Sequence, residues 1–171
     1  LTLSNENVGS RGVTGGFGSL PGWAREWATT RDTKTHVPQF TTMRLAELLT
    51  NSGKMPPGER FGSELIRKSA GLAGRSDSDD GGVQPDYGFG GNDPGDSRAR
   101  YESTMENLLG VGTRNHESSA AILSGTFADG SALPDDYNRD QTLRWLARHE
   151  WRDNGEGVGH LTDWIGQYAD N

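Results

Sequence analysis

Apolar residues recur at steps of three and four along much of this 171-residue chain, and that spacing is typical of one face of an α-helix. Trp23 and Trp27 stand four residues apart, and Phe61 and Leu65 do the same. The pattern predicts helices at about 21–29, 41–50, 58–74, 98–124, 138–149 and 155–169. We therefore expect an all-α fold, a small bundle of five or six helices.

Residue types at the helix ends agree with these boundaries. Pro21 suits the first position of a helix, and Thr41 is a suitable N-cap. Asn138, with Gln141 three residues later, resembles a capping box, whereas Gly125 is typical of a residue that ends a helix.

The most regular pattern covers residues 98–124. Its steps continue through two central glycines without a change of phase, which predicts one helix, bent at the glycines. Small residues at Gly112, Ser119 and Ala120 would let a neighbouring helix approach closely. His116 falls on the apolar stripe, so we expect a buried, neutral imidazole that is hydrogen-bonded.

The last two helices are predicted to pack antiparallel, because their connection is short. On helix 138–149 the predicted buried face consists of Leu143, Leu146 and Ala147. Trp145 is expected on the opposite face. The stripe of helix 155–169 consists of Leu161, Trp164, Ile165 and Tyr168.

The connection between these helices is rich in acidic residues and glycines. Asp153 and Glu156 are placed to cap the last helix, where carboxylates suit the positive end of the helix dipole. Asn154–Gly155 supplies the turn, and Gly157 and Gly159 would allow a tight helix crossing. The alternating glycines follow a helix rather than a strand, so they do not fit a dinucleotide-binding loop.

Composition divides the chain into four parts of one domain. Residues 1–20 hold five glycines and predict an extended arm; residues 21–74 hold the N-terminal helices. Residues 75–97 are acidic and dense in glycine, which predicts a flexible loop. A calcium site there is an alternative, although the loop lacks the ligand order of an EF-hand. Residues 98–171 are expected to form the C-terminal helical core.

The charge balance excludes several classes of partner. The net charge is −7 and no cluster of lysine and arginine forms a stripe, so we expect no nucleic-acid partner. No apolar run is long enough to span a membrane. The chain has no cysteine, begins at Leu1 and has no signal-peptide pattern; we expect it to be part of a longer protein.

Candidate catalytic or metal-binding chemistry is weak. His149 and Glu150 do not complete the zinc motif H-E-x-x-H, because position 153 is aspartate. His160 and Asp163 could share a ligand, but a third ligand cannot be named. We predict no catalytic residue, no metal and no cofactor. Five tryptophans are many for this length, and we predict Trp145 and Trp151 as partner-binding aromatics.

Three motifs carry a resemblance to a known family. They lie at Arg114–Gly125, Pro134–Asp140 and Trp151–Ile165. Together they resemble a module of large actinobacterial proteins that contain a "TPR repeat region" and are associated with type VII secretion or polymorphic toxins. The resemblance implies a helical, non-catalytic module without known catalytic residues, although the 34-residue TPR consensus is not recognisable here.

These observations predict a structural or protein-interaction module of a larger protein, which the resemblance implies to be secreted or associated with the cell envelope. Its partners would be other proteins, including other domains of the parent chain. An alternative is a toxin or enzyme domain with a site around His116 or His149. An antitoxin or chaperone that masks a basic partner is a third hypothesis.

Overall fold

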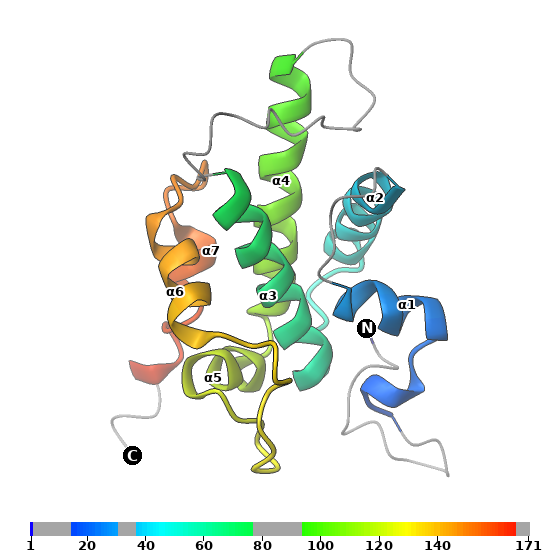
Figure 1. Ribbon diagram of the computed structural model, residues 1–171, viewed down its shortest axis with the longest axis vertical. Coiled ribbons are helices and arrows are strands. Elements are labelled where there is room, and N and C mark those ends of the chain that lie inside the picture. Colours follow the sequence, from blue (N-terminus) through cyan, green and yellow to red (C-terminus); the bar gives the residue numbers. More distant parts are fainter. Residues whose placement is uncertain (2–14, 31–36, 77–93, 167–171) are drawn as a thin grey trace.

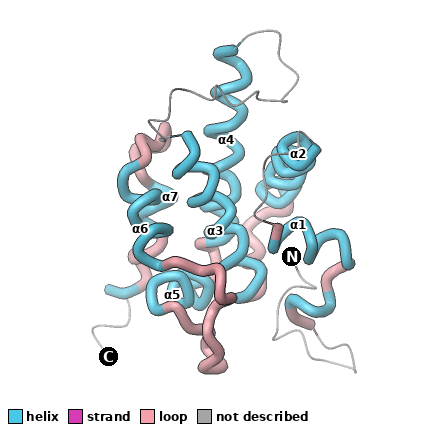
Figure 2. Tube along the Cα trace, in the orientation of Figure 1, coloured by secondary structure: helices cyan, strands magenta, loops and turns pink. Residues whose placement is uncertain are grey.

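The structure, a computed structural model, describes residues 1, 15–30, 37–76 and 94–166, without the side chains of 37–40 and 94–97. Its helices are α1 (Gly22–Thr29), α2 (Val37–Asn51), α3 (Glu59–Ser76), α4 (Pro94–Gly112), α5 (His116–Ser124), α6 (Arg139–Arg148) and α7 (Glu156–Gly159). Over the described ranges there is no strand, only an isolated bridge between Thr126 and Ala132 (Figure 2). The predicted all-α fold is confirmed.

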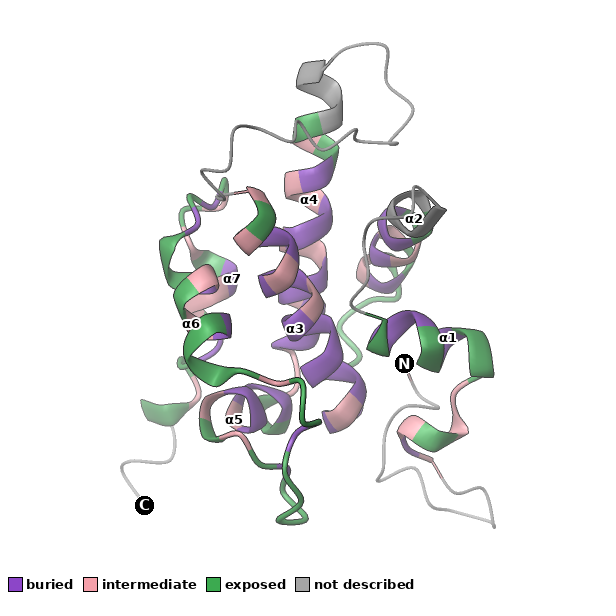
Figure 3. Ribbon diagram, in the orientation of Figure 1, coloured by how far each residue is buried: buried purple, intermediate pink, exposed green. Residues whose placement is uncertain are grey.

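Helix α3 lies at the centre of the bundle. Helices α1, α4, α5 and α6 pack against it, whereas α2 and α7 pack against α4 (Figure 1). Every residue from 61 to 67 is buried, including the polar Ser63, Glu64 and Arg67. Figure 3 shows buried residues along α3 and α4 and mostly exposed residues on the outer side of α6. We expected the late helices to form most of the core, but the structure gives the central position to α3.

Two glycines let α3 and α4 cross closely. A Cβ atom on Gly112 would lie 2.8 Å from the carbonyl oxygen of Gly62, nearer than real Cβ contacts allow. A Cβ atom on Gly62 would lie 3.1 Å from the Gly112 carbonyl oxygen on α4 and 2.2 Å from the Ser118 hydroxyl oxygen on α5. The predicted role of Gly112 in close packing is therefore confirmed.

The single helix predicted at 98–124 is wrong, because the chain breaks after Gly112. The Thr113 hydroxyl donates to the Leu109 carbonyl at 3.0 Å, and Asn115 leaves the helical conformation with φ −103° and ψ 113°. The side-chain oxygen of Asn115 then accepts the N–H of Glu117 at 2.9 Å and caps α5. The break turns α5 so that it, too, packs on α3.

Several predicted boundaries need smaller corrections. Helices α1 and α3 lie where the pattern places them, and Gly125 ends α5 with a φ of 86°. Thr41 is not an N-cap, because α2 already begins at Val37. The start of α4 at Pro94 makes 94–97 helical rather than loop. Arg75 and Ser76 likewise belong to α3 rather than to a loop, whereas residues 77–93 of the predicted acidic loop and residues 2–14 of the predicted arm lie outside the described residues.

The predicted buried face of α6 is confirmed at Leu146 and partly at Leu143, which packs against the core, but it is wrong at Ala147. Thr142, Leu146 and His149 are buried, whereas Ala147 is exposed. Trp145, predicted on the opposite face, packs on α3: a Cβ atom on Gly74 would lie 2.3 Å from its indole. The Asn138 cap is confirmed, since its side-chain oxygen accepts the Gln141 N–H at 2.9 Å.

The last helix is much shorter than predicted. Helix α7 covers only Glu156–Gly159, and turns follow it. Leu161 is buried, but Ile165 is 47% exposed and Tyr168 lies outside the described residues. Helix α7 packs on α4 rather than antiparallel to α6; Gly157 brings it close, with Leu109 3.2 Å from where a Cβ atom would stand.

The segment between α5 and α6 projects from one end of the bundle and is tied to α3 by charged groups (Figure 1). Arg67 is 2.9 Å from Glu64 and 2.8 Å from Asp136, and its side chain is only 4% exposed. Arg60 binds Asp129 at 2.8 Å. These pairs fix the projecting segment to α3, so that α6 enters the bundle at a defined position.

Candidate interaction site

A cleft of about 370 Å³ lies between α2 and α4. Met43 and Glu47, one helical turn apart, form its α2 side. The other side consists of Ala99, Arg100, Ser103, Thr104 and Asn107 on α4, with Arg152 from the turn after α6. The three- and four-residue steps on α4 place its lining residues on one face of the helix. The lining combines apolar, neutral polar and charged side chains, and it includes two arginines, a residue type that is enriched in protein–protein interfaces.

Arg152 is held in position at the cleft by α4. Its Nη1 atom donates to the Ala99 carbonyl at 3.2 Å and to the Ser103 hydroxyl at 3.4 Å. Its Nε atom is 3.7 Å from the Glu102 carboxylate, and the side chain remains 51% exposed. A guanidinium group oriented in this way loses little further entropy when it binds a partner's acceptor groups.

Glu106 links α4 to the turn that carries Arg152. Its carboxylate accepts the backbone N–H of Arg152 at 3.1 Å. Burial, followed by repulsion from Asp153, raises the pKa of Glu106 above its ordinary value, although Arg152 opposes this rise. The attachment therefore carries an electrostatic strain that protonation of Glu106 would relieve.

Asp153 organises the turn itself, as predicted. Its two carboxylate oxygens accept the N–H groups of Gly155 and Gly157, each at 2.9 Å. Asn154 and Gly155 both have positive φ angles, 57° and 82°. The acidic, glycine-rich stretch between α6 and α7 is therefore a turn, and through Arg152 it contributes to the cleft.

The two predicted partner-binding tryptophans both take part in internal packing. Trp151 is only 8% exposed and donates from its indole to the Leu146 carbonyl at 2.8 Å. Trp145 is half-buried against Gly74. Neither residue lines the cleft. Partner binding through them stays a prediction.

None of the three histidines that the structure describes lines the cleft. His116, predicted to be buried, is exposed at the start of α5 and stacks on Trp164 with ring centroids 6.0 Å apart. His149 is buried and packs edge-to-face against Trp151, with ring centroids 4.8 Å apart. Within the described ranges, no three His, Asp or Glu side chains are arranged to hold a metal ion.

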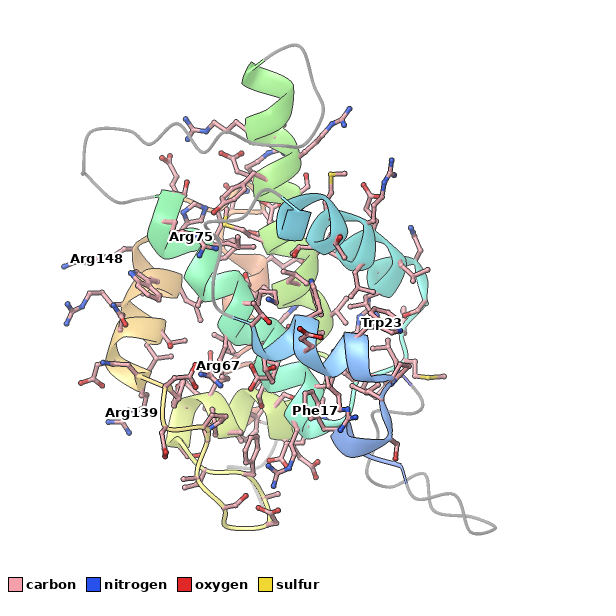
Figure 4. The ribbon with its side chains drawn as sticks, turned by 45° about the vertical axis from the view of Figure 1, so that its right-hand side comes forward. Phe17, Trp23, Arg67, Arg75, Arg139 and Arg148 are labelled. Carbon is pink, nitrogen blue, oxygen red and sulfur yellow. The ribbon has the colours of Figure 1, made fainter. Side chains whose placement is uncertain are left out.

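The sequence pattern placed an exposed aromatic side chain at Trp145, but the most exposed large apolar side chains of the described residues lie on α1 and α2. Leu48 on the outer side of α2 is 65% exposed, and Trp23 on α1 is 61% exposed (Figure 4). Figure 4 also shows Arg139 and Arg148 pointing from α6 away from the bundle. The cleft and Leu48 were missed because sequence spacing alone does not show which helix packs beside α2.

These features define a helical module with a cleft between two of its helices. The chain belongs to the TPR repeat domain family, whose model matches residues 1–164. No curated protein and no solved structure matches the chain. None of the helices in the described ranges is both long and apolar enough to span a membrane.

Proposed function

We propose that this chain is a protein-interaction module that binds a segment of a partner protein in the cleft between α2 and α4. The family assignment supports binding of proteins, because TPR-type helical arrays use surfaces lined by neighbouring helices for this purpose. The cleft between α2 and α4 is the observation that supports this location of the binding site. Its mixed lining includes Arg152, which α4 holds in a fixed orientation.

The setting of this module follows from the sequence motifs. We infer a large secreted or envelope-associated actinobacterial parent protein of the type VII secretion or polymorphic-toxin kind, as the resemblance implies. Trp145 is retained as a secondary partner contact, since it is only half-buried. The enzyme alternative at His116 or His149 has no support in the cleft, which neither histidine lines.

Filling the cleft tests this proposal. Ala99 lines the cleft and Ala147 is exposed on α6, so Ala99→Trp and Ala147→Trp form a matched pair of variants. Binders are first selected from a displayed peptide library, with the wild-type protein as the target. Their Kd is then measured against both variants by fluorescence anisotropy.

We expect Ala99→Trp to weaken the selected binders at least tenfold, because an indole would occupy the volume that a partner needs. Ala147→Trp should leave their Kd unchanged. Circular dichroism and thermal unfolding establish that both variants are folded. Equal Kd values for Ala99→Trp and the wild type would show that the cleft is not the binding site.

A further inference from the structure

The turn that carries Arg152 also contains Asn154–Gly155, the one Asn–Gly pair in the sequence. Asn154 is exposed, and its backbone N–H donates to the Trp151 carbonyl at 3.2 Å. An asparagine amide followed by glycine is prone to intramolecular attack, because glycine has no side chain to shield its nitrogen. The local chemistry therefore favours a covalent change at Asn154.

The reaction is a cyclisation followed by hydrolysis. The Gly155 nitrogen bonds to Cγ of Asn154, the bond from Cγ to Nδ2 of Asn154 breaks, and ammonia leaves with the proton from the Gly155 nitrogen. Water then opens the resulting succinimide at either carbonyl. One opening gives aspartate and the other gives isoaspartate, which adds a methylene group to the main chain. Water is the only co-reactant.

The folded turn opposes the first step in two ways. Asn154 has a φ of 57° and Gly155 a φ of 82°, so both residues are held in the left-handed region by the turn. The N–H of Gly155 also donates to the Asp153 carboxylate at 2.9 Å. A negative charge at this distance disfavours loss of the proton from that nitrogen.

We propose that Asn154 is a site of spontaneous deamidation, and that Asp153 restrains the reaction by holding the Gly155 N–H in the closed turn. The reaction then proceeds when the turn opens. Its product carries a new carboxylate next to Asp153, which already repels Glu106. Deamidation should therefore loosen the attachment of the turn to α4.

Asp129–Gly130 provides an internal comparison, because an aspartate followed by glycine can form the same succinimide as Asn154–Gly155. Hydrogen bonds from Ser131, followed by the bond from Arg60, lower the pKa of Asp129 to about 2. Succinimide formation from aspartate needs the protonated carboxyl group, because an ionised carboxylate reacts poorly with an amide nitrogen. The low pKa keeps Asp129 ionised more of the time than an ordinary aspartate, so its cyclisation is slow. We therefore expect isoaspartate to accumulate at position 154 before it accumulates at 129.

The test follows deamidation of the full-length protein at neutral pH and physiological temperature. Peptide mapping by mass spectrometry, with chromatographic separation of aspartate from isoaspartate, gives the rate at each site. Asp153→Ala removes the restraint, and Asp153→Asn keeps a hydrogen-bond acceptor without the charge. Asp163→Ala is the control, because Asp163 is 63% exposed and lies outside the turn.

We expect deamidation at Asn154 to be about tenfold faster in Asp153→Ala than in the wild type, since a hydrogen bond to a charged group contributes at least that factor. Asp153→Asn should give an intermediate rate, and Asp163→Ala the wild-type rate. Equal rates in Asp153→Ala and the wild type would overturn the proposal. It would also be overturned if Asn154 stayed intact in every folded variant while the urea-unfolded protein reacted.

The loss of Asn154 has a consequence for partner binding that rests on the proposed function. Arg152 is two residues away and lines the cleft, so the deamidated fraction should bind cleft partners more weakly than the intact fraction. The deamidation rate itself does not depend on any partner. A failed binding experiment would therefore leave the deamidation proposal intact. A failed deamidation experiment would likewise leave the proposed binding site intact.

Discussion

Replacing Gly112 with alanine tests the close crossing of α3 and α4 at the centre of the bundle. The added Cβ atom would lie 2.8 Å from the Gly62 carbonyl oxygen and 2.7 Å from Cγ1 of Ile66. The carbonyl oxygen belongs to the backbone, so the helices must move apart. Such overpacking costs roughly 1–3 kcal/mol, and the lower backbone entropy of alanine in the unfolded state returns about 0.5–1 kcal/mol.

We therefore expect Gly112→Ala to lower the free energy of unfolding by roughly 1–2 kcal/mol, as the balance of overpacking and backbone entropy. Gly110 lies on the same helix, and its Cβ atom would meet nothing within 4 Å. Gly110→Ala should therefore gain about 0.5–1 kcal/mol from helix propensity. Urea unfolding followed by tryptophan fluorescence measures both. If Gly112→Ala proves as stable as Gly110→Ala, the crossing is not as close as described.

Three further single variants and one double variant test the electrostatics and a helix cap by urea unfolding. Burial and repulsion from Asp153 raise the pKa of Glu106, so the folded protein binds a proton at Glu106 more tightly than the unfolded chain does. Protonation of Glu106 therefore stabilises the fold, and this stabilisation is lost as the pH rises through the pKa of the folded state. Because glutamine resembles the protonated carboxyl group, Glu106→Gln should be more stable than the wild type at neutral pH, and this difference should shrink in mildly acidic solution. A difference that stays constant with pH would contradict a raised pKa of Glu106. Asn115→Ala removes the cap of α5 and should cost about 1–2 kcal/mol, whereas no loss would mean that α5 does not need it. Arg67→Met removes the partner of the buried Glu64 and should cost about 3–5 kcal/mol, and adding Glu64→Gln should restore part of that loss.

The sequence predicted helices well where one apolar stripe was unambiguous. Phe61, Leu65 and Ile66 set the phase of α3, and its observed bounds agree closely with the predicted range. The break at 113–115 was not predicted, because the apolar steps keep their phase across it. Asn115 was the available signal, since asparagine is a preferred N-cap and here ends the continuity of the helix.

The buried face of α6 was predicted correctly at Leu146 but not at Ala147 and Trp145, because two stripes of similar hydrophobicity overlap there. Leu143 and Ala147 favoured one face, but Gly74 provides the space that accepts Trp145 on the other. That space belongs to α3, far away in the sequence. The last helix was overestimated for a related reason: Leu161 packs well, but Ile165 remains exposed and adds little to helix stability.

The cleft could not be predicted from local patterns. Its α2 and α4 sides lie more than 50 residues apart in the sequence, and Arg152 joins them from a third segment. The sequence did predict the turn that positions Arg152, including the capping role of Asp153. It therefore provided one component of the candidate site, while tertiary packing determined the others.

Hydrogen–deuterium exchange of the full-length protein, with and without a binder selected on the wild type, tests the central claim most directly. Binding in the cleft should slow amide exchange in segments 43–47 and 99–107 and around residue 152, because a bound segment would cover these lining residues. Exchange on the outer side of α6 should not change. Protection confined to residues 139–148, with the cleft segments unaffected, would contradict the account.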